Sequence, residues 1–232
     1  MAQHTWRLAP PAPALRGALE LDSAQRSVTE WGTGPALVLG GPGTGKTSLI
    51  LESVLDRMAQ GVAGSAILVL AHGRDAAAEL REQFALRVGD GETPRVTTFH
   101  SLALDLVVRA ADEEAPLRLL SGAEQERAVR DVLDGTIEDP LLRETWPESL
   151  REAVATRGFA REVRAAFAAA RGLGLAGDEV ARFGKRANDI AWSSVGSVLD
   201  MYLESQDQQL ALDYAELMFR AVALLRTNAH VV

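Results

Sequence analysis

The chain contains no cysteine, and only two of its 232 residues, Lys46 and Lys185, are lysines. Without cysteine, neither disulfides nor thiolate metal sites are possible. We expect no secretion signal, because Pro10, Pro11 and Pro13 interrupt the N-terminal stretch where an apolar core would have to run. We therefore expect a cytoplasmic protein that does not enter a membrane.

Acidic side chains outnumber basic ones, and the net charge is −8 at pH 7. This balance argues against a protein that coats nucleic acid through overall basic charge. The excess is concentrated in residues 111–212, which carry 12 basic and 19 acidic side chains. Any contact with phosphates must therefore come from local basic patches, and such binding should depend on salt.

The first third of the chain alternates between strand-like and helix-like patterns. Residues 36–39, 66–71 and 95–99 are short runs of buried-strand type, and apolar side chains follow each run at helical spacing. Strands that alternate with helices predict a parallel sheet with crossover connections. The fold class expected for this part is α/β.

From about residue 113 the strand-like pattern disappears for roughly a hundred residues. The segment reads as helices broken by glycine and proline, at Gly135, Pro140, Pro147, Gly172, Gly174 and Gly184. We predict a flexible tail (1–20), an α/β first domain (21–112), an all-helical insert (113–212) and a return helix (213–232) that packs back onto the first domain.

Residues 40–47 carry the complete Gly-x4-Gly-Lys-Thr pattern of a phosphate-binding loop, between a predicted strand and a predicted helix. Glycines let the backbone curl so that its N–H groups face phosphate oxygens. Lys46 should reach the β- and γ-phosphates, and Thr47 should ligate Mg²⁺, so both have predicted catalytic roles. The expected cofactors are ATP and Mg²⁺. The predicted nucleotide-binding residues are Gln25, Gly40, Gly41, Pro42, Gly43, Thr44, Gly45, Lys46 and Thr47.

Gln25 precedes this loop by fifteen residues. Its amide offers one donor group and one acceptor, which match the adjacent N6 and N7 atoms of adenine. The alternative is a residue that caps a helix, since Asp22 and Ser23 are typical of a helix start.

Five segments, "LDSAQRSV", "GGPGTGKT", "AAAELREQF", "VTTFHSLALDLV" and "LDYAELMFRAVALL", occur in the order and spacing of the UvrD/Rep/PcrA-type superfamily 1 DNA helicases, which the chain resembles. The resemblance implies an incomplete RecA-like P-loop sheet with an all-helical insert. It also implies a 3′→5′ motor on single-stranded DNA, acting in repair or recombination. The stretch "LREAVATRGFAREVRAAF" looks like the insert of the AdnA/AdnB-like branch, whose members pair with a sister subunit.

The resemblance also implies a groove for single-stranded DNA, to which His72, Arg74, Thr98, Phe99 and His100 would contribute. An aromatic ring such as Phe99 could stack on a base, and Arg74 could bind a phosphate. The alternatives are a packing role for His100 and a partly buried Phe99. Where the family has Thr-Phe-Thr-Asn-Lys or a close variant, this chain has Ala-His-Gly-Arg-Asp at 71–75, which implies a weaker grip on DNA.

Four arginines of the insert, Arg157, Arg161, Arg164 and Arg171, fall within about 80° of one another on a helix. Phe159, Val163, Phe167 and Ala170 occupy the opposite face. One interpretation is a solvated face with acidic partners on neighbouring helices. The other is a contact with duplex DNA ahead of the motor, made by Arg157, Arg161 and Arg164.

Hydrolysis of ATP also requires a carboxylate pair at the end of a buried strand. No apolar run that ends in Asp-Glu occurs in the 232 residues. We therefore expect an N-terminal fragment of a helicase that binds nucleotide and hydrolyses it hardly at all alone. Two alternatives are a small-molecule kinase, with Asp75 near the acceptor, and a non-catalytic module that binds nucleotide and docks a partner.

Overall fold

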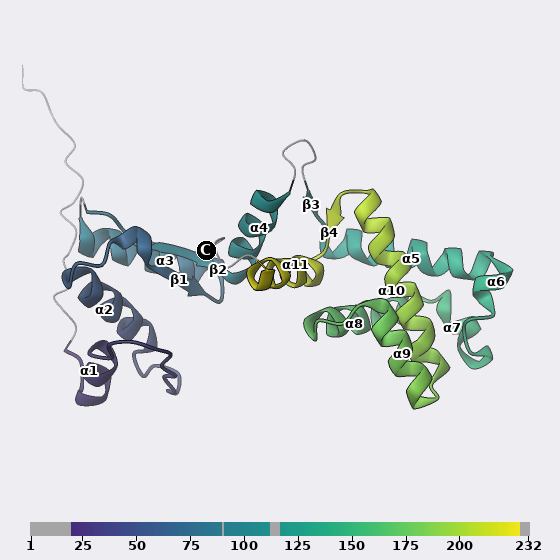
Figure 1. Ribbon diagram of the computed structural model, residues 1–232, viewed down its shortest axis with the longest axis horizontal. Coiled ribbons are helices and arrows are strands. Elements are labelled where there is room, and N and C mark those ends of the chain that lie inside the picture. Colours follow the sequence, from purple (N-terminus) through teal and green to yellow (C-terminus); the bar gives the residue numbers. More distant parts are fainter. Residues whose placement is uncertain (1–19, 90, 112–116, 228–232) are drawn as a thin grey trace, which may run out of the picture. The chain divides into compact units, whose positions relative to one another are not determined.

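The computed structural model describes residues 20–89, 91–111 and 117–227 (Figure 1). The predicted tail lies outside the described residues, apart from Glu20. Between Phe99 and His100 the chain divides into two compact units. We call the first the phosphate-loop unit and the second the helical unit, and each is described by itself. The partition of the chain at residues 112 and 212 stays a prediction.

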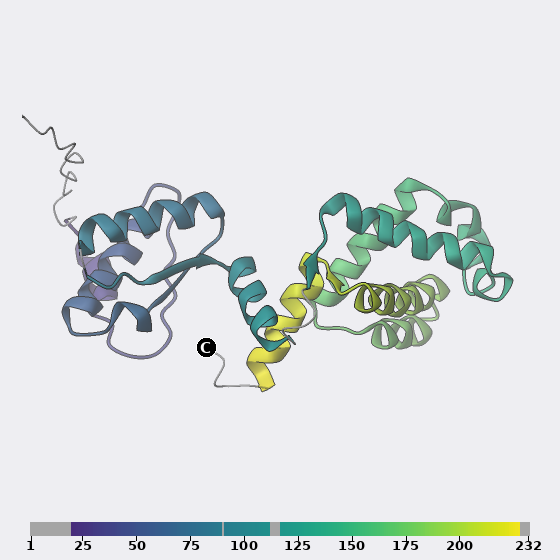
Figure 2. The same cartoon turned by 90° about the horizontal axis from the view of Figure 1, so that it is seen from above.

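The phosphate-loop unit consists of short helices and two strands. Its elements are α1 (Ser23–Thr29), α2 (Lys46–Ala59), η1 (Gly64–Ala66), β1 (Leu68–Ala71), α3 (Arg74–Val88) and β2 (Arg95–Thr98). The strands pair in parallel, with Leu68 opposite Arg95 and Ala71 opposite Thr98. This confirms the parallel pairing that the alternating pattern predicts. In Figure 2, α3 runs alongside the two strands.

The core of this unit lies where α2 and α3 meet the strands. Phe84 is fully buried, and Leu80 and Ala77 of α3 are nearly so. They pack with Leu51 and Val54 of α2, and with Val69, Ala71 and Val96 of the strands. Gly64 of η1 lies directly against the loop before β2, where a Cβ would clash with the Glu92 carbonyl oxygen.

The strand predicted at residues 36–39 is wrong: the structure gives this stretch no regular secondary structure. Leu37 and Leu39 are each 84% exposed. A strand needs a neighbour to take up its backbone hydrogen bonds. In the described part of this unit, β1 and β2 pair only with each other, and residues 36–39 take part in no ladder.

The helical unit contains the remaining elements. These are α4 (Phe99–Ala110, which begins at the unit boundary), β3 (Arg118–Leu119), α5 (Gly122–Glu138), α6 (Pro140–Arg143), η2 (Glu148–Leu150), α7 (Arg151–Val154), α8 (Arg157–Gly172), α9 (Gly177–Ala187), α10 (Ile190–Gln208), β4 (Ala211–Leu212) and α11 (Tyr214–Thr227). No helix in the described part of the chain is long and apolar enough to cross a membrane.

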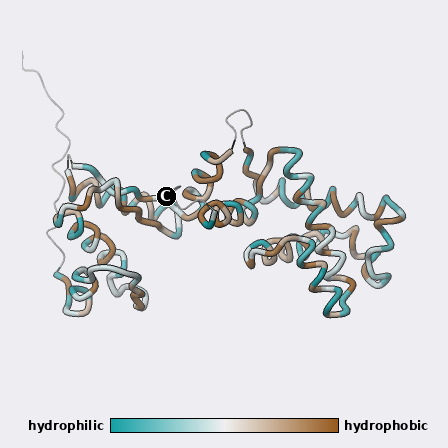
Figure 3. Tube along the Cα trace, in the orientation of Figure 1, coloured by the Kyte–Doolittle hydropathy of each residue, from teal (hydrophilic) through white to brown (hydrophobic). Residues whose placement is uncertain are grey.

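Two cores hold this unit together. The larger joins α5, α7, α8, α9 and α10 around Trp146, Phe167 and Tyr202. The smaller joins α4 to α11, which bury Ala103 and Val107 against Leu217 and Ala221; Figure 3 colours these apolar segments brown. A helix, α11, occupies the predicted return segment, and it packs on α4 and on α8. Its return onto the first domain stays a prediction.

The expectation of an all-helical insert is wrong in one respect. Where the chain enters and leaves the helices, β3 and β4 pair in parallel over two residues, Arg118 with Ala211 and Leu119 with Leu212. The pairing is too short to produce a visible alternation in the sequence, which explains why periodicity misses it.

Two glycines predicted to break helices lie inside them. Gly135 belongs to α5, with no atom near the position of a Cβ, and Gly184 belongs to α9. A Cβ at Gly184 would clash with the backbone nitrogen of Ser193, and Gly177 and Gly196 are equally close to the facing helix. These three glycines therefore allow the backbones of α9 and α10 to approach each other.

We predict opposite effects for alanine at these two positions. Gly184→Ala should lower the free energy of unfolding by about 1–3 kcal/mol, because the new methyl group must push α9 away from α10. Gly135→Ala should raise it by about 0.5–1 kcal/mol, because alanine favours a helix interior and meets nothing here. Urea unfolding followed by tryptophan fluorescence, to which buried Trp146 contributes, measures both. Equal effects of the two substitutions would contradict the close approach of the helices.

Candidate nucleotide and DNA sites

The phosphate loop owes its shape to two glycines in left-handed conformations. Gly43 has φ 75° and Gly45 has φ 81°, values that only glycine adopts without strain. Helix α2 begins directly after this turn, at Lys46, and no side chain caps its first N–H groups. Such uncapped N–H groups at a helix start favour an anion, and phosphates above all.

The side chain of Lys46 extends across the phosphate loop. Its ammonium group donates hydrogen bonds to the carbonyls of Gly40, at 2.9 Å, and Gly41, at 2.6 Å. The Thr44 hydroxyl donates to the Gly41 carbonyl at 2.9 Å. A Cβ at Gly40 would come within 2.6 Å of that hydroxyl oxygen. The loop therefore closes on itself with one positive charge at its centre.

The residues of the loop fit a triphosphate with a divalent cation. Gly40, Gly41, Pro42, Gly43 and Thr44 are exposed. Thr47, the predicted Mg²⁺ ligand, is also exposed and is the second residue of α2. The loop thus offers uncapped N–H donors, an ammonium group and a hydroxyl on one short segment, the donor set that phosphates and a hard cation require.

Both groups of the Gln25 amide have partners. The oxygen accepts from the Asp22 backbone N–H at 3.0 Å, which completes a capping box with the Asp22 side chain. The nitrogen donates to the Thr44 carbonyl at 3.4 Å and would lie 3.1 Å from a Cβ at Gly45. Gln25 therefore caps α1 and also contacts the loop, and these two roles require the same orientation of the amide.

A cavity of about 370 Å³ opens beside these groups. It is lined by Gln25 and Val28 of α1, by Leu37 and Leu39, and by Thr44 and Lys46. Its walls are largely apolar, and its polar lining comes from the loop, Asp22 and Gln25. A flat base next to a phosphate chain needs such a combination.

The candidate DNA residues of the phosphate-loop unit follow the ends of the paired strands. Ala71 pairs with Thr98, so His72 and Arg74 leave the sheet at the edge from which Phe99 also leaves. His72 and Arg74 are exposed, and Phe99 is 46% exposed. Thr98 is only 8% exposed, so its side chain belongs more to the sheet than to the surface.

His100 begins the helical unit and has an aromatic neighbour there. Its ring meets the Tyr214 ring edge to face, with the centroids 5.3 Å apart. Tyr214 is 44% exposed at the start of α11. The sequence indicates Tyr214 only as part of an apolar helix face, and nothing in its spacing predicts the contact with His100.

The arginine stripe of α8 is only partly a surface feature. Arg157 and Arg161 are exposed, and neither forms an ion pair with any described residue. Arg164 is half-buried and donates to the Gly122 carbonyl at 3.4 Å. Arg171 is 7% exposed. The prediction that Arg171 shares one open face with the other three is therefore wrong.

Arg171 is buried because α11 covers it. Its guanidinium group binds the Glu216 carboxylate at 2.6 and 2.7 Å, donates to the Leu175 carbonyl at 3.0 Å, and lies 3.3 Å from the centroid of the Phe219 ring. The acidic partner on a neighbouring helix, one of the two interpretations above, is thus observed for this arginine. The apolar face of Val163, Phe167 and Ala170 is buried as predicted.

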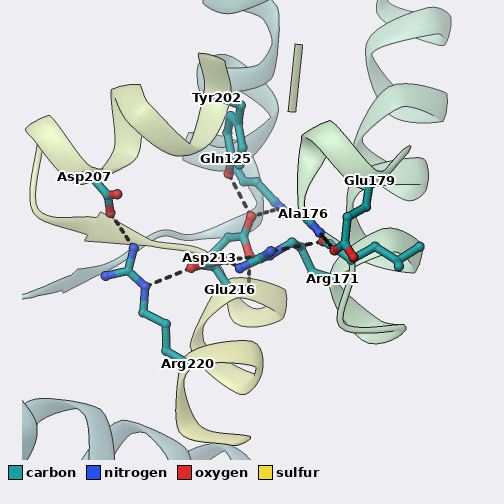
Figure 4. A network of polar contacts seen from close by, with 10 residues as sticks. Gln125, Arg171, Ala176, Glu179, Tyr202, Asp207, Asp213, Glu216 and Arg220 are labelled. Carbon is teal, nitrogen blue, oxygen red and sulfur yellow. Dashed lines mark hydrogen bonds and ion pairs between the residues drawn. The ribbon is translucent and has the colours of Figure 1, made fainter. Parts of the chain in front are cut away.

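Glu216 and its neighbour Asp213 connect four elements of the helical unit (Figure 4). Glu216 also binds Arg220 at 2.8 Å, and Arg220 in turn pairs with Asp207. Asp213 accepts from the Tyr202 hydroxyl and the Gln125 amide, each at 2.8 Å. Burial and the adjacent Asp213 carboxylate raise the pKa of the Tyr202 phenol far above its usual value, so Tyr202 remains a hydrogen-bond donor.

A glycine-rich loop with two left-handed glycines, leading into a helix that opens with Lys-Thr, is typical of P-loop proteins. The chain belongs to the UvrD/REP helicase N-terminal domain family, whose sequence model matches residues 21–232.

Three relatives illustrate the similarity. The chain is 30% identical over 127 residues to the ATP-dependent DNA helicase Rep of Escherichia coli, covering 52% of this chain and 19% of Rep. It is 31% identical over 137 residues to the ATP-dependent DNA helicase UvrD1 of Mycobacterium leprae, covering 58% and 17%. It is 28% identical over 120 residues to the ATP-dependent DNA helicase PcrA of Staphylococcus aureus, covering 49% and 16%. The chain therefore spans less than a fifth of each relative. The narrower resemblance to the AdnA/AdnB-like branch stays a prediction.

We predict that Arg171 and Arg161 differ sharply in their effect on stability. Arg171→Met should lower the free energy of unfolding by about 3 kcal/mol, because it leaves Glu216 buried with Arg220 as its remaining charged partner. Arg161→Met, on the same helix, should change it by less than about 0.5 kcal/mol. Urea unfolding of both variants under identical conditions provides the measurement. A small effect at Arg171 would show that α11 does not depend on this ion pair.

Proposed function

We propose that this chain is the ATP-binding N-terminal part of a DNA helicase that couples ATP hydrolysis to movement along single-stranded DNA. The proposal depends above all on the conformation of the phosphate loop. Two left-handed glycines turn the backbone into the start of α2, and hydrogen bonds hold the Lys46 ammonium group at the centre of the loop. Membership of the helicase family supports the DNA substrate. The direction of movement is 3′→5′ and the setting is repair or recombination, as the family resemblance implies.

Lys46 and Thr47 take the phosphate and metal roles in this proposal. When ATP binds, the ammonium group of Lys46 exchanges the Gly40 and Gly41 carbonyls for phosphate oxygens, a stronger charge-assisted interaction. Thr47 supplies a hydroxyl ligand to Mg²⁺, and the ion neutralises charge on the phosphates. Gln25 faces the cavity beside the loop and reads the edge of adenine.

The DNA-binding residues of the proposal fall into two groups. Thr98 ends β2, and His72, Arg74 and Phe99 follow the paired strand ends of the phosphate-loop unit. His100 follows Phe99 directly in the chain. Phe99 offers a partly exposed ring for a base, and Arg74 offers a charge for a phosphate. Arg157, Arg161 and Arg164 of α8 form the second group, which we assign to duplex DNA.

Nucleotide binding is tested by Lys46→Ala and Gln25→Ala. Lys46→Ala should weaken binding of Mg-ATP by about 10- to 100-fold, because a charge-assisted contact with the phosphates is lost. Gln25→Ala should instead reduce the preference for ATP over GTP by about tenfold, because the contact with the base is lost while Lys46 still binds the phosphates. Loss of the α1 cap and of the contact with the Thr44 carbonyl should affect both nucleotides alike. Titration calorimetry with both nucleotides measures these effects. The control is Gln60→Ala, at the far end of α2, which should behave like the unchanged chain. An unchanged preference for ATP in Gln25→Ala would refute the adenine contact and leave only the capping role.

Duplex binding is tested by reversing two charges on α8. The double variant Arg161→Glu/Arg164→Glu should bind duplex DNA at least tenfold more weakly at low salt, and the dependence of affinity on salt should become shallower. The control variant Arg127→Glu/Arg143→Glu makes the same change in net charge on α5 and α6. If both double variants lose affinity equally, the effect comes from net charge, and the α8 stripe is not a DNA contact.

A further inference from the structure

The tip of the α9–α10 hairpin presents large apolar side chains to solvent. Phe183 is 53% exposed, Ile190 62% and Trp192 40%. All three lie within ten residues, at the end of α9 and the start of α10, where Asn188 and Asp189 connect the helices. Exposed aromatic residues grouped in this way are unusual on a free surface and indicate a binding site.

Basic residues lie next to these residues in the chain. The tip carries Arg182, Lys185 and Arg186, against one acidic residue, Asp189, in a part of the chain whose charge is otherwise acidic. Lys185 and Arg186 are exposed and form no ion pair with any residue in the described ranges. Arg182 pairs with Asp178 one turn earlier, at 2.9 Å. The tip therefore combines aromatic rings with two unpaired cations.

The backbone holds this tip in one conformation. Gly184 lets α9 lie directly against the start of α10. Asn188 is left-handed, with φ 54°, and the Asp189 N–H donates to the Gly184 carbonyl at 2.9 Å. The Asp189 carboxylate caps α10 by accepting from the Trp192 N–H at 3.3 Å. A surface that is rigid before binding loses little conformational entropy when a ligand arrives.

We propose that the α9–α10 tip binds single-stranded DNA, with Phe183 and Trp192 stacking on bases and Lys185 and Arg186 binding phosphates. Aromatic faces interleaved with cations are what an unpaired strand requires, since each nucleotide offers a flat base and a negative charge. A protein ligand rich in acidic residues would use the cations but leaves the two rings without a matching partner. The inference rests on the proposed DNA function and adds a contact distinct from the α8 stripe.

The test measures binding of the full chain to a fluorescent oligo(dT) of about 16 nucleotides by anisotropy, over a range of salt concentrations. Phe183→Ala should weaken binding about fivefold or more, because one base loses its stacking partner. Lys185→Gln/Arg186→Gln should make the slope of log affinity against log salt shallower by about 1.4, because two phosphate contacts are lost. The matched controls are Leu141→Ala, whose side chain is 80% exposed, and Arg127→Gln/Arg143→Gln.

A second measurement uses a variant that keeps an aromatic ring at the substituted position, so that its result does not depend on the stability of a variant without the ring. Oligo(dT) should quench the tryptophan fluorescence of the chain, and Trp192→Phe, which keeps an aromatic ring at this position, should lose most of that quenching. The inference is overturned if the tip variants bind oligo(dT) as the controls do, while the unchanged chain binds it. It is also overturned if poly-glutamate of equal charge displaces oligo(dT) as effectively as unlabelled oligo(dT), since the tip would then favour an acidic protein. If the unchanged chain does not bind DNA at all, the proposed function fails as well.

Discussion

The phosphate loop depends on backbone geometry that only glycine supplies at two positions. With Gly43 and Gly45 in left-handed conformations, the chain turns sharply enough for α2 to begin at Lys46, and for the lysine to reach back over the loop. Two side chains form hydrogen bonds with this loop. The Thr44 hydroxyl donates to the Gly41 carbonyl, and the Gln25 amide of α1 donates to the Thr44 carbonyl. Main-chain conformation therefore determines the shape of the candidate nucleotide site, and Lys46 adds its charge.

The helical unit is organised by a different interaction, the buried ion pair between Arg171 and Glu216. Burying two charges is unfavourable unless their remaining hydrogen-bonding capacity is used. Here Arg171 also binds the Leu175 carbonyl and the Phe219 ring, and Glu216 also binds Arg220. Because these partners come from α8, α11 and the segment that follows α8, the ion pair fixes how the return helix lies on the insert. The same helix, α8, leaves Arg157 and Arg161 exposed at its other end.

Local patterns in the sequence predict the local features well. The motif at 40–47 identifies the loop and the start of α2, and the runs at 66–71 and 95–99 locate β1 and β2. Helical spacing identifies the buried face of α8. Features that depend on distant neighbours are predicted less well. The sequence predicts a strand at residues 36–39, but this stretch has no pairing partner in the described structure. It predicts an exposed Arg171, which α11 covers in the structure. It also predicts a helix end at Gly184, which instead permits a close contact between two helices. The exposed rings of Phe183 and Trp192 also cannot be distinguished from core residues by sequence, because residue type alone does not reveal exposure.

The central claim is that the backbone N–H groups around Gly43–Lys46 receive the phosphates of ATP. The most direct measurement is the change in backbone amide chemical shifts when Mg-ATP is added to isotope-labelled chain. We expect the largest shifts at Gly43, Gly45, Lys46 and Thr47, with small shifts in α5–α10. Large shifts confined to the helical unit, with an unchanged loop, would contradict the account.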